Sequence, residues 1–349
     1  MRSIAAALLI ASALSAHAQS DRFRFGGFGD AVFVYASRSG HTSLDGGELD
    51  LFASARLTDN WSILGEGFIQ HELRGEDVDL PSTKRVDFEL ERLYAAYNPS
   101  DRLRVEIGQI HTGIISWNAR EHRGRFLQTP IATPTIAIRE EQGGAWPLRF
   151  IGVWVSGRLP GTLGVQYGAG VGEARGAARD EIQPLLDERS KLARLVTLSI
   201  APDSLPGLEA GAAAYDGNIP APDGKLREHD GTLFASFVHN GIELRSEWAE
   251  MHHHRLADGA DFVTHGWYAL ASFRPPGRWK ALRPYVLIDQ LDAAAGEVYL
   301  SDVHDQKAEA LGVRWDAAKW LALKGELRSH LTANGSRDQG ARVQIAFSF

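Results

Sequence analysis

Apolar and polar residues alternate with a period of two along several stretches of this chain of 349 residues. The clearest stretches are residues 48–57, 102–107, 242–248 and 321–328. Successive side chains of a β-strand point to opposite faces, so each stretch predicts a strand with one apolar and one polar face. Because no stretch shows the longer period of an amphipathic helix, we expect an all-β fold.

The chain ends on such a strand. In residues 341–349, apolar side chains such as Val343 and Ile345 alternate with polar ones such as Arg342 up to the C-terminal Phe349. A soluble protein gains little from an exposed aromatic terminal strand, whereas the last strand of a bacterial outer-membrane barrel closes the cylinder between lipid and lumen. A terminal strand that ends in phenylalanine resembles the signal read by the outer-membrane assembly machinery. We therefore expect Phe349 to be an assembly signal at the periplasmic edge.

The connections between the strands distinguish a barrel from a soluble sandwich. Short turn signals rich in Pro, Gly, Asp and Asn alternate with longer polar stretches. The longer stretches lie near residues 38–46, 74–84, 114–145, 175–190, 218–229, 253–261, 293–302 and 332–338. Because short periplasmic turns and long extracellular loops alternate in this way, the pattern predicts a transmembrane antiparallel β-barrel of about 16 strands. Residues 190–201 and 282–292 alternate poorly, which leaves the count open by about two strands.

The N-terminus predicts export. Met1 to Ser3 is a short basic start, an apolar run from Ile4 to Ala16 follows, and Ala16-His17-Ala18 supplies a small-residue cleavage pattern. The apolar run is too short for a transmembrane anchor. We expect a signal peptide over residues 1–18, removed on export, and an outer-membrane barrel over residues 19–349.

Composition agrees with a barrel. The chain has no cysteine, 36 glycines and nine tryptophans, which fits strands joined by tight turns and flanked by aromatic girdles. Its formal net charge of −7 argues against a nucleic-acid partner. The girdle residues predicted beside periplasmic turns are Trp61, Tyr97, Trp279 and Trp320.

A family resemblance covers roughly residues 85–160. The stretch 88–97, the turn Pro99-Ser100-Asp101 and the stretch 103–109 look like the strand–turn–strand core of Gram-negative porins. The continuation 110–118 is similar to porin-like outer-membrane proteins related to the phosphate-selective porins. Phosphate selectivity is not carried over, because the lysine-rich lumen expected for it is missing here.

The resemblance implies that the third long loop, residues 114–145, folds into the barrel and narrows the pore. Its candidate constriction residues are Arg120, Arg123, Arg125, Arg139 and Glu140. Charges that line a narrow aqueous passage select ions, so a basic part facing the lumen would favour small anions. The alternative is that these charges lie on the cell-surface side, solvated or paired with lipopolysaccharide.

Polar strand faces supply further lumen candidates, since a charge facing lipid costs a few kcal/mol near the membrane midplane. These candidates are Arg56, Glu66, Arg102, Arg104, Glu106, Glu243, Arg245, Glu247, Lys324, Glu326, Arg328 and Arg342. The alternative is structural: charges of opposite sign brace neighbouring strands and touch no solute. Arg92 breaks the alternation of its strand, which predicts a β-bulge between Leu90 and Leu93.

The remaining signals point away from chemistry. His252-His253-His254 suggests a metal site, but no repeated spacing of Asp, Glu or His completes a ligand set, so a polar loop is the preferred interpretation. A barrel enzyme would need a nucleophile or activated water beside an oriented base, and no such signature is present. No cofactor is expected.

Taken together, the sequence predicts an outer-membrane porin that passes small hydrophilic solutes or ions through a water-filled barrel. The alternative is a substrate-specific or non-conducting barrel that acts as a receptor or structural protein. The expected partners are outer-membrane lipid and lipopolysaccharide, the barrel assembly machinery and a homotrimer of the chain. Small residues around 207–217 suggest close packing between copies.

Overall fold

The computed structural model describes residues 22–36, 42–45, 47–72, 85–121, 124–173, 175–178, 192–221, 224–331 and 337–349. The predicted signal peptide over residues 1–18 and the candidate Arg123 lie outside these residues. No helix in the described ranges is long and apolar enough to cross a membrane.

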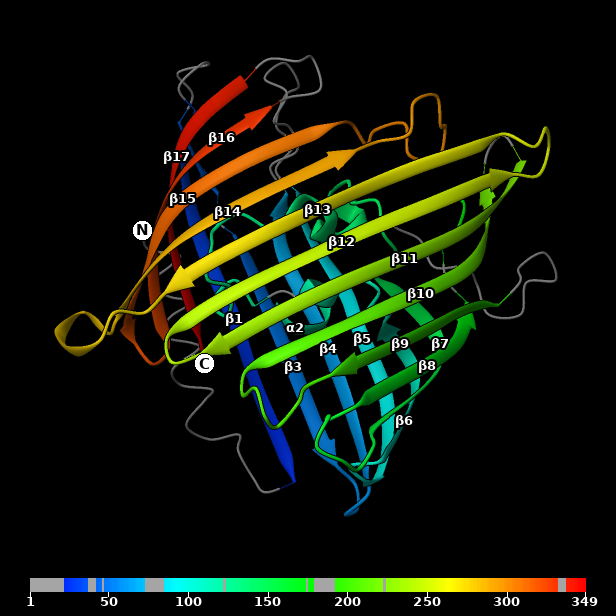
Figure 1. Cartoon of the computed structure of the whole chain (residues 1–349), viewed down its shortest axis with the longest axis horizontal. Coiled ribbons are helices and arrows are strands. Elements are labelled where there is room, and N and C mark those ends of the chain that lie inside the picture. The colour runs from blue at the N-terminus through cyan, green and yellow to red at the C-terminus, as the bar shows by residue number, and fades with distance from the viewer. Residues whose placement is uncertain are drawn as a thin grey trace.

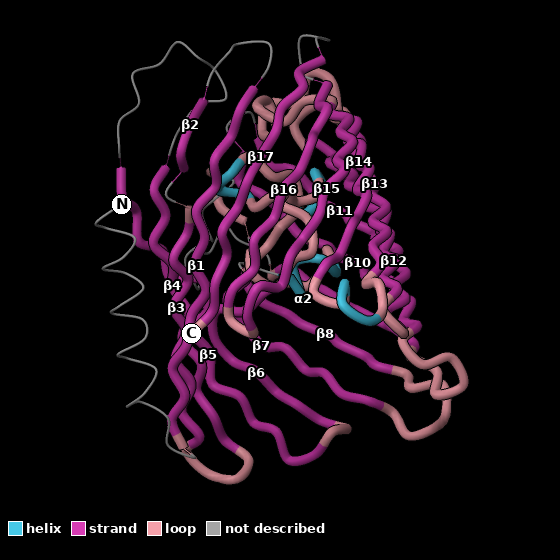
Figure 2. The backbone as a smooth tube through the Cα atoms, turned by 90° about the vertical axis from the view of Figure 1, so that its left-hand side faces the viewer, coloured by secondary structure: helices cyan, strands magenta, loops and turns pink. Residues whose placement is uncertain are grey.

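The described residues form one antiparallel sheet that curls around and closes on itself (Figures 1 and 2). Its strands are β1 (Phe23–Ala36), β2 (Thr42–Asp45), β3 (Glu48–Arg56), β4 (Trp61–Glu72), β5 (Arg85–Ser100), β6 (Leu103–His111), β7 (Arg149–Arg158), β8 (Gln166–Glu173), β9 (Ala193–Ile200), β10 (Leu208–Ala221), β11 (Gly224–His239), β12 (Ile242–Arg255), β13 (Asp261–Phe273), β14 (Leu282–Asp292), β15 (Gln306–Ala318), β16 (Leu321–Leu331) and β17 (Arg337–Ser348). The helical segments are α2 (Ser116–Glu121) and three single turns, η1 (Thr135–Ala137), η2 (Glu140–Gln142) and η3 (Gly277–Trp279).

Two of the strands, β2 and β3, together occupy a single position in the barrel. β2 pairs with residues 32–35 of β1, and β3 pairs with residues 23–29 of the same edge. Gly47 sits between them with a φ of 69°, and a Cβ on it would lie 2.1 Å from the carbonyl oxygen of Asp30. The barrel therefore has sixteen strand positions, which confirms the predicted fold class and strand count.

The alternation predicted for the strands is also confirmed. On β12, Leu244 and Trp248 are exposed on the outer face, whereas Glu243 and Glu247 are buried on the inner face. Leu327 on β16 is 64% exposed on the outer face. An exposed apolar surface of this kind is expected where the solvent is lipid.

The terminal strands close the barrel. β17 pairs with β1 from Phe28–Ser348 to Ala36–Gly340, and Phe349 exchanges backbone hydrogen bonds of 3.0 and 3.1 Å with Gly27. A Cβ on Gly27 would lie 2.6 Å from the Phe349 ring, so glycine lets the ring lie against the wall. We call the barrel end that holds Phe23 and Phe349 the turn end, and the opposite end the loop end.

The predicted order of long and short connections holds only in part. Residues 218–229 do not form a loop, because β10 and β11 continue through them and leave only residues 222–223 between the strands. The predicted loop over residues 253–261 is present but shorter, because β12 continues to Arg255 and β13 begins at Asp261. The polar residues that suggested loops, such as Arg227 and His229, instead lie on the outer face of long strands.

The predicted bulge on β5 is confirmed. Glu66 pairs with Arg92 while the adjacent Gly67 pairs with Leu90, so Glu91 is the extra residue. The bulge turns Glu91 into the interior, where it is fully buried.

Candidate pore constriction

The connection between β6 and β7, residues 112–148, crosses the interior of the barrel (Figures 1 and 2). We call it the inner loop. Its two ends meet at the wall, where the backbone N–H of Thr112 donates to the Leu148 carbonyl at 2.8 Å and the Thr112 hydroxyl donates to the Pro147 carbonyl at 2.6 Å. A loop clamped at its base is held as a unit and can be positioned by contacts along its length.

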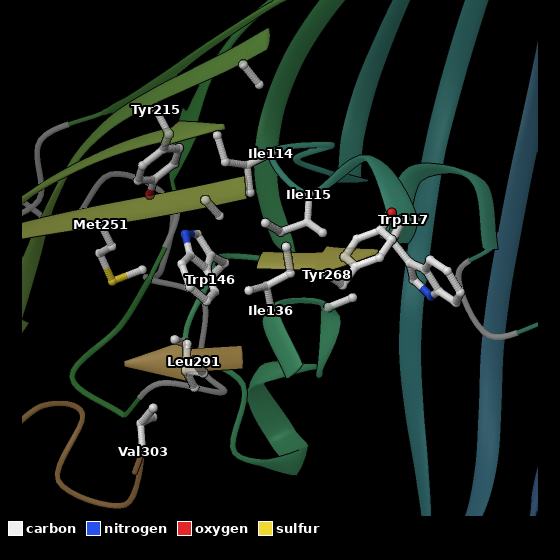
Figure 3. Close-up of a cluster of buried hydrophobic side chains, with 14 of the residues drawn as sticks. Ile114, Ile115, Trp117, Ile136, Trp146, Tyr215, Met251, Tyr268, Leu291 and Val303 are labelled. Carbon is white, nitrogen blue, oxygen red and sulfur yellow. The ribbon is translucent and has the colours of Figure 1, made fainter. Parts of the chain in front are cut away.

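Apolar side chains of the inner loop pack against one side of the barrel (Figure 3). Trp117 meets Tyr268 edge-to-face with ring centroids 5.4 Å apart, and a Cβ on Gly266 would lie 2.6 Å from a methyl group of Ile136. The buried wall residues in the same core include Leu195, Tyr215, Met251, Leu270, Leu287 and Leu291. Residues 193–195 and 285–291 alternate poorly in part for this reason. Leu195, Leu287 and Leu291 point inward and pack in this core rather than face water.

Carboxylates of the wall accept hydrogen bonds from the backbone of the inner loop. Glu247, 1% exposed, accepts from the Ser116 hydroxyl at 2.9 Å and from the Trp117 N–H at 3.3 Å, at the start of α2. Glu326 accepts from the N–H groups of Ile131 and Ala132, both at 3.1 Å. These acids satisfy loop amides that would otherwise be buried without a partner.

Cations of the same wall hold loop carbonyls. Lys324 Nζ donates to the Pro130 carbonyl at 3.1 Å, and Arg314 Nη1 donates to the Gln128 carbonyl at 2.8 Å. Arg245 pairs with Glu121 at the end of α2. Burial raises the pKa of Glu121, against the opposing influence of Arg245.

Arg175, the first described residue after β8 and its following gap, joins three parts of the interior. Its guanidinium binds Glu140 of the inner loop and Glu228 of β11, each at 2.7 Å, and it lies 5.7 Å from the ring centre of Tyr299. Burial opposes its charge, but Glu228 and then Glu140 raise the pKa of Arg175 well above its usual range. Burial likewise raises the pKa of Glu140, which Arg175 opposes. Arg175 therefore connects the inner loop to β11 and to the segment between β14 and β15.

The structure distributes the predicted constriction residues among different partners. Arg120 pairs with Glu209 and lies over the Phe234 ring, and Arg125 donates to the Thr133 hydroxyl at 2.9 Å. Arg139 pairs with Glu48 of β3, and Glu140 is buried beside Arg175. A space of about 20 Å³ remains between the inner loop and β3, lined by Glu48, Asn118, Arg125, Gln128, Arg139 and Gln142 among others.

The predicted lumen residues fall into two groups. Arg245, Glu247, Glu243, Lys324 and Glu326 contact the inner loop or its neighbours and are mostly buried. The others lie outside that packing: Glu66 paired with Arg92, Arg56 and Arg102 at the turn end, the Arg104–Glu106 pair at 2.8 Å, and Arg328 and Arg342 on β16 and β17. Sequence reasoning missed Arg24 and Arg175; reading the period-two pattern of residues 23–36 would have placed Arg24 inward.

Both acids and cations are buried on the inner wall, but the charges that stay exposed there are mostly arginines. The buried acids include Asp30, Asp50, Glu66, Glu91, Glu228, Asp230, Glu243, Glu247, Asp289 and Glu326. The arginines that remain partly or fully exposed include Arg24, Arg56, Arg92, Arg104, Arg125, Arg328 and Arg342. Partly exposed acids such as Glu106 and Glu209 are paired with arginines. Among the described residues of the inner wall, exposed arginines therefore outnumber exposed acids, although the chain carries a net negative charge.

The histidine triplet is split between the two faces of β12. His253 points inward, where it pairs with Glu297, while His252 and His254 point outward and pair with Glu250 at 2.6 Å and Asp261 at 2.8 Å. Within the described residues, no group of three or more His, Asp or Glu side chains is placed to hold a metal ion. The triplet lies on a strand rather than in the predicted loop.

Comparison with solved structures identifies the architecture. The anion-selective porin from Comamonas acidovorans superposes with a TM-score of 0.64 at 14% identity, over 94% of this chain and 99% of that one. The fold is that of the outer-membrane porins. OmpF from Salmonella typhi, solved with daunomycin, gives a TM-score of 0.62 at 13% identity, over 94% and 97% of the two chains.

A third porin-like neighbour is the outer membrane channel DcaP of Acinetobacter baumannii, with a TM-score of 0.61 at 13% identity over 94% and 97% of the chains. No protein-family model and no curated protein sequence matches the chain. The structural similarity establishes a porin-like fold, but the sequence identities are too low to show more than the fold. The resemblance to relatives of the phosphate-selective porins stays a prediction.

Proposed function

We propose that the protein is an outer-membrane porin that lets small hydrophilic solutes diffuse passively, with a preference for anions. The observation that carries the proposal is the excess of arginines among the exposed charges of the inner wall. Acids such as Glu247 and Glu326 accept hydrogen bonds from the inner loop and are buried. Arginines such as Arg24, Arg56 and Arg104 stay at least partly exposed to water.

The passage runs beside the inner loop rather than through the barrel centre. We expect a solute that enters from the loop end to pass Arg125 and the Arg139–Glu48 pair, and then the exposed arginines toward the turn end. Fields are strong where water is scarce, so this sequence of cations favours anions and disfavours cations. The likeness to a porin named as anion-selective supports the same preference.

The remaining expectations concern the cellular setting. We expect residues 1–18 to be removed on export, the turn end to face the periplasm, and the assembly machinery to read Phe349. Small outward residues on β1, β3 and β4, such as Ala31, Ala53 and Gly65, support a flat contact in a homotrimer. Of the small residues first considered, Gly211 and Ala213 instead face the lumen. We expect lipopolysaccharide around the outer wall and no catalytic activity.

Planar-bilayer recording tests the proposal. Purified, folded protein should give discrete conductance steps, and the reversal potential in a KCl gradient should report a higher permeability for chloride. The combined variant Arg24→Gln, Arg56→Gln, Arg104→Gln should lower the chloride-to-potassium permeability ratio roughly threefold or more. The matched control Arg278→Gln, Lys280→Gln, Lys319→Gln removes the same charge from exposed turns outside the lumen and should leave the ratio unchanged.

A non-conducting barrel is the second candidate, because the inner loop and residues 293–305 bury an extensive apolar core inside the barrel that includes Trp146, Tyr299 and Leu300. Absence of conductance steps from folded protein would favour it. A cation preference in the unmodified protein would refute the charge argument while leaving the channel itself intact.

A further inference from the structure

Three phenylalanines lie on the inner wall of β1, β3 and β4. Phe28 pairs across the strands with Asp50, which pairs with Phe68, and Phe52 lies one inward position nearer the turn end. The register therefore places the three rings around Asp50, directly below the level of Glu48 at the constriction. Aromatic side chains are not what a polar lumen wall requires.

Phe28 and Phe52 are not part of the buried core that holds the inner loop. Their ring centroids are 5.8 Å apart, the planes are tilted by 37°, and both side chains are partly exposed. Phe68 is fully buried and lies under the Arg139 guanidinium, 5.2 Å from its ring centre. Two rings thus face the lumen, and the third is covered by a constriction arginine.

Gly26 allows Phe52 to lie close to the wall. A Cβ at residue 26 would come within 2.7 Å of the ring carbon Cζ of Phe52. Since this neighbour on β1 has no side chain, the ring rests against the strand and offers its other face to the interior.

Arginines surround the rings on the turn-end side. Arg24 is the next inward residue of β1 after Gly26, and Arg56 lies two inward positions beyond Phe52 on β3. Arg92 pairs with Glu66, which is the cross-strand neighbour of Phe52. A solute that has passed the constriction meets an aromatic surface and guanidinium groups on the same wall.

We propose that Phe28 and Phe52, with Arg24, Arg56 and Arg92, form a transit site for aromatic carboxylates; this rests on the proposed anion channel. Guanidinium groups bind carboxylates with directed, charge-assisted hydrogen bonds, and they attract any small anion. Tilted or edge-on contacts with Phe28 and Phe52 add affinity only for an anion that carries a ring. The site should therefore bind an anion that carries an aromatic ring more tightly than one that does not. The arginines alone would not make this distinction.

The test uses benzoate and acetate as probes on the full-length protein in planar bilayers. Each anion is titrated against a fixed KCl current, and the concentration that halves the chloride current is measured. Benzoate should act at a roughly five- to tenfold lower concentration than acetate. The combined variant Phe28→Ala, Phe52→Ala should lose most of that difference while keeping the chloride-to-potassium permeability ratio.

Phe33→Ala is the matched control, because Phe33 lies on β1 but is 45% exposed on the lipid-facing side. It should keep the benzoate preference. If the double alanine variant does not fold, Phe28→Leu with Phe52→Leu keeps the apolar volume and should still weaken benzoate.

Two results overturn the proposal: equal potency of benzoate and acetate in the unmodified protein, or a benzoate preference that survives the loss of both rings. Either result leaves the anion channel standing. A protein with no anion preference at all removes the proposed function first, and the transit site with it.

Discussion

The inner faces of β11–β16 and those of β1 and β3–β6 both carry many charges, yet the two walls put them to different use. On the first, which we call the loop-contacting wall, Glu247, Glu326 and Lys324 hydrogen-bond the inner loop and are buried. On the second, the water-facing wall, Arg24 and Arg104 are exposed. From this difference we expect the ion selectivity of the barrel to depend on the charges that stay exposed to water, rather than on all charges of the inner wall.

The inner loop binds the acids and the cations of the wall through different backbone groups. A loop crossing the interior presents backbone N–H groups, and a carboxylate is a strong acceptor that can serve two of them at once, as Glu326 does. Guanidinium and ammonium groups only donate, so they bind loop carbonyls instead, as Arg314 and Lys324 do. The net charge of the chain, −7, consequently says nothing reliable about the sign inside the pore.

The largest expected effect is a loss of folded barrel when the contact between β1 and β17, where the barrel closes, is weakened. β1 and β17 are joined by the strand ladder, by the hydrogen bond that the Gln344 amide donates to Asp30, and by Phe349 packed against Gly27. Deleting Phe349 should remove most of the folded, heat-modifiable barrel from the outer membrane, as measured on gels of membrane fractions. Normal levels of folded protein would contradict both the assembly role and this account of how the barrel closes.

The second prediction breaks the loop-contacting wall. Replacing Glu247 and Glu326 by alanine removes the carboxylate acceptors of five loop donors. The cost is about 1–3 kcal/mol for each buried donor that is left without a partner. The midpoint of thermal unfolding should fall, and single-channel conductance should roughly double as the loop leaves the lumen.

The control for this pair is Glu250→Ala, which removes an outward acid of β12 that is paired with His252. It should leave conductance unchanged. An unaltered conductance in the double variant would show that the inner loop keeps its place through apolar packing alone.

A third, smaller effect contrasts one acid from each wall. Glu106 is partly exposed beside Arg104, so Glu106→Gln should raise the chloride-to-potassium permeability ratio about twofold. Glu243 is buried by Thr129 and Ser272, so Glu243→Gln should leave the ratio close to its original value. Reversal potentials in a KCl gradient measure both; equal shifts would mean that exposure does not decide selectivity.

The water-facing wall was largely predictable from sequence. Period-two alternation identified Arg56, Arg104 and Glu106 as inward residues, and the same rule applied to residues 23–36 finds Arg24 and Phe28. On a strand, local order fixes the face, so no distant contact is needed to know where a side chain points.

The loop-contacting wall could not be predicted in the same way. Glu247 is 131 positions from Ser116, and nothing local shows that this acid binds the start of a distant helix while Glu106 pairs with Arg104 of its own strand. The prediction of a loop over residues 218–229 was wrong for a related reason. Polar residues on both faces of a long strand give the same sequence pattern as a loop. Burial by another segment removes the alternation on which strand prediction depends.

The smallest expected effect is a change in pH dependence at the edge of the loop-contacting wall. Burial raises the pKa of Glu140 above its ordinary value of 4.5, so the contribution of this group to stability is present below about that pH and lost as pH rises through the folded-state pKa. Glu140→Gln should therefore make the thermal midpoint fall less between pH 4.5 and 7 than it does in the unmodified protein.

Asp258 provides the control for this change, because it lies on the exposed loop between β12 and β13. Its hydrogen bond from Arg255 lowers its pKa to about 2, so its contribution is lost only as pH falls through that value. Asp258→Asn should leave the slope between pH 4.5 and 7 unchanged. If Glu140→Gln behaves like Asp258→Asn, then Glu140 is charged at no net cost and Arg175 compensates its burial fully. Glu140 and Arg175 would then remain an ion pair across the whole range from pH 4.5 to 7.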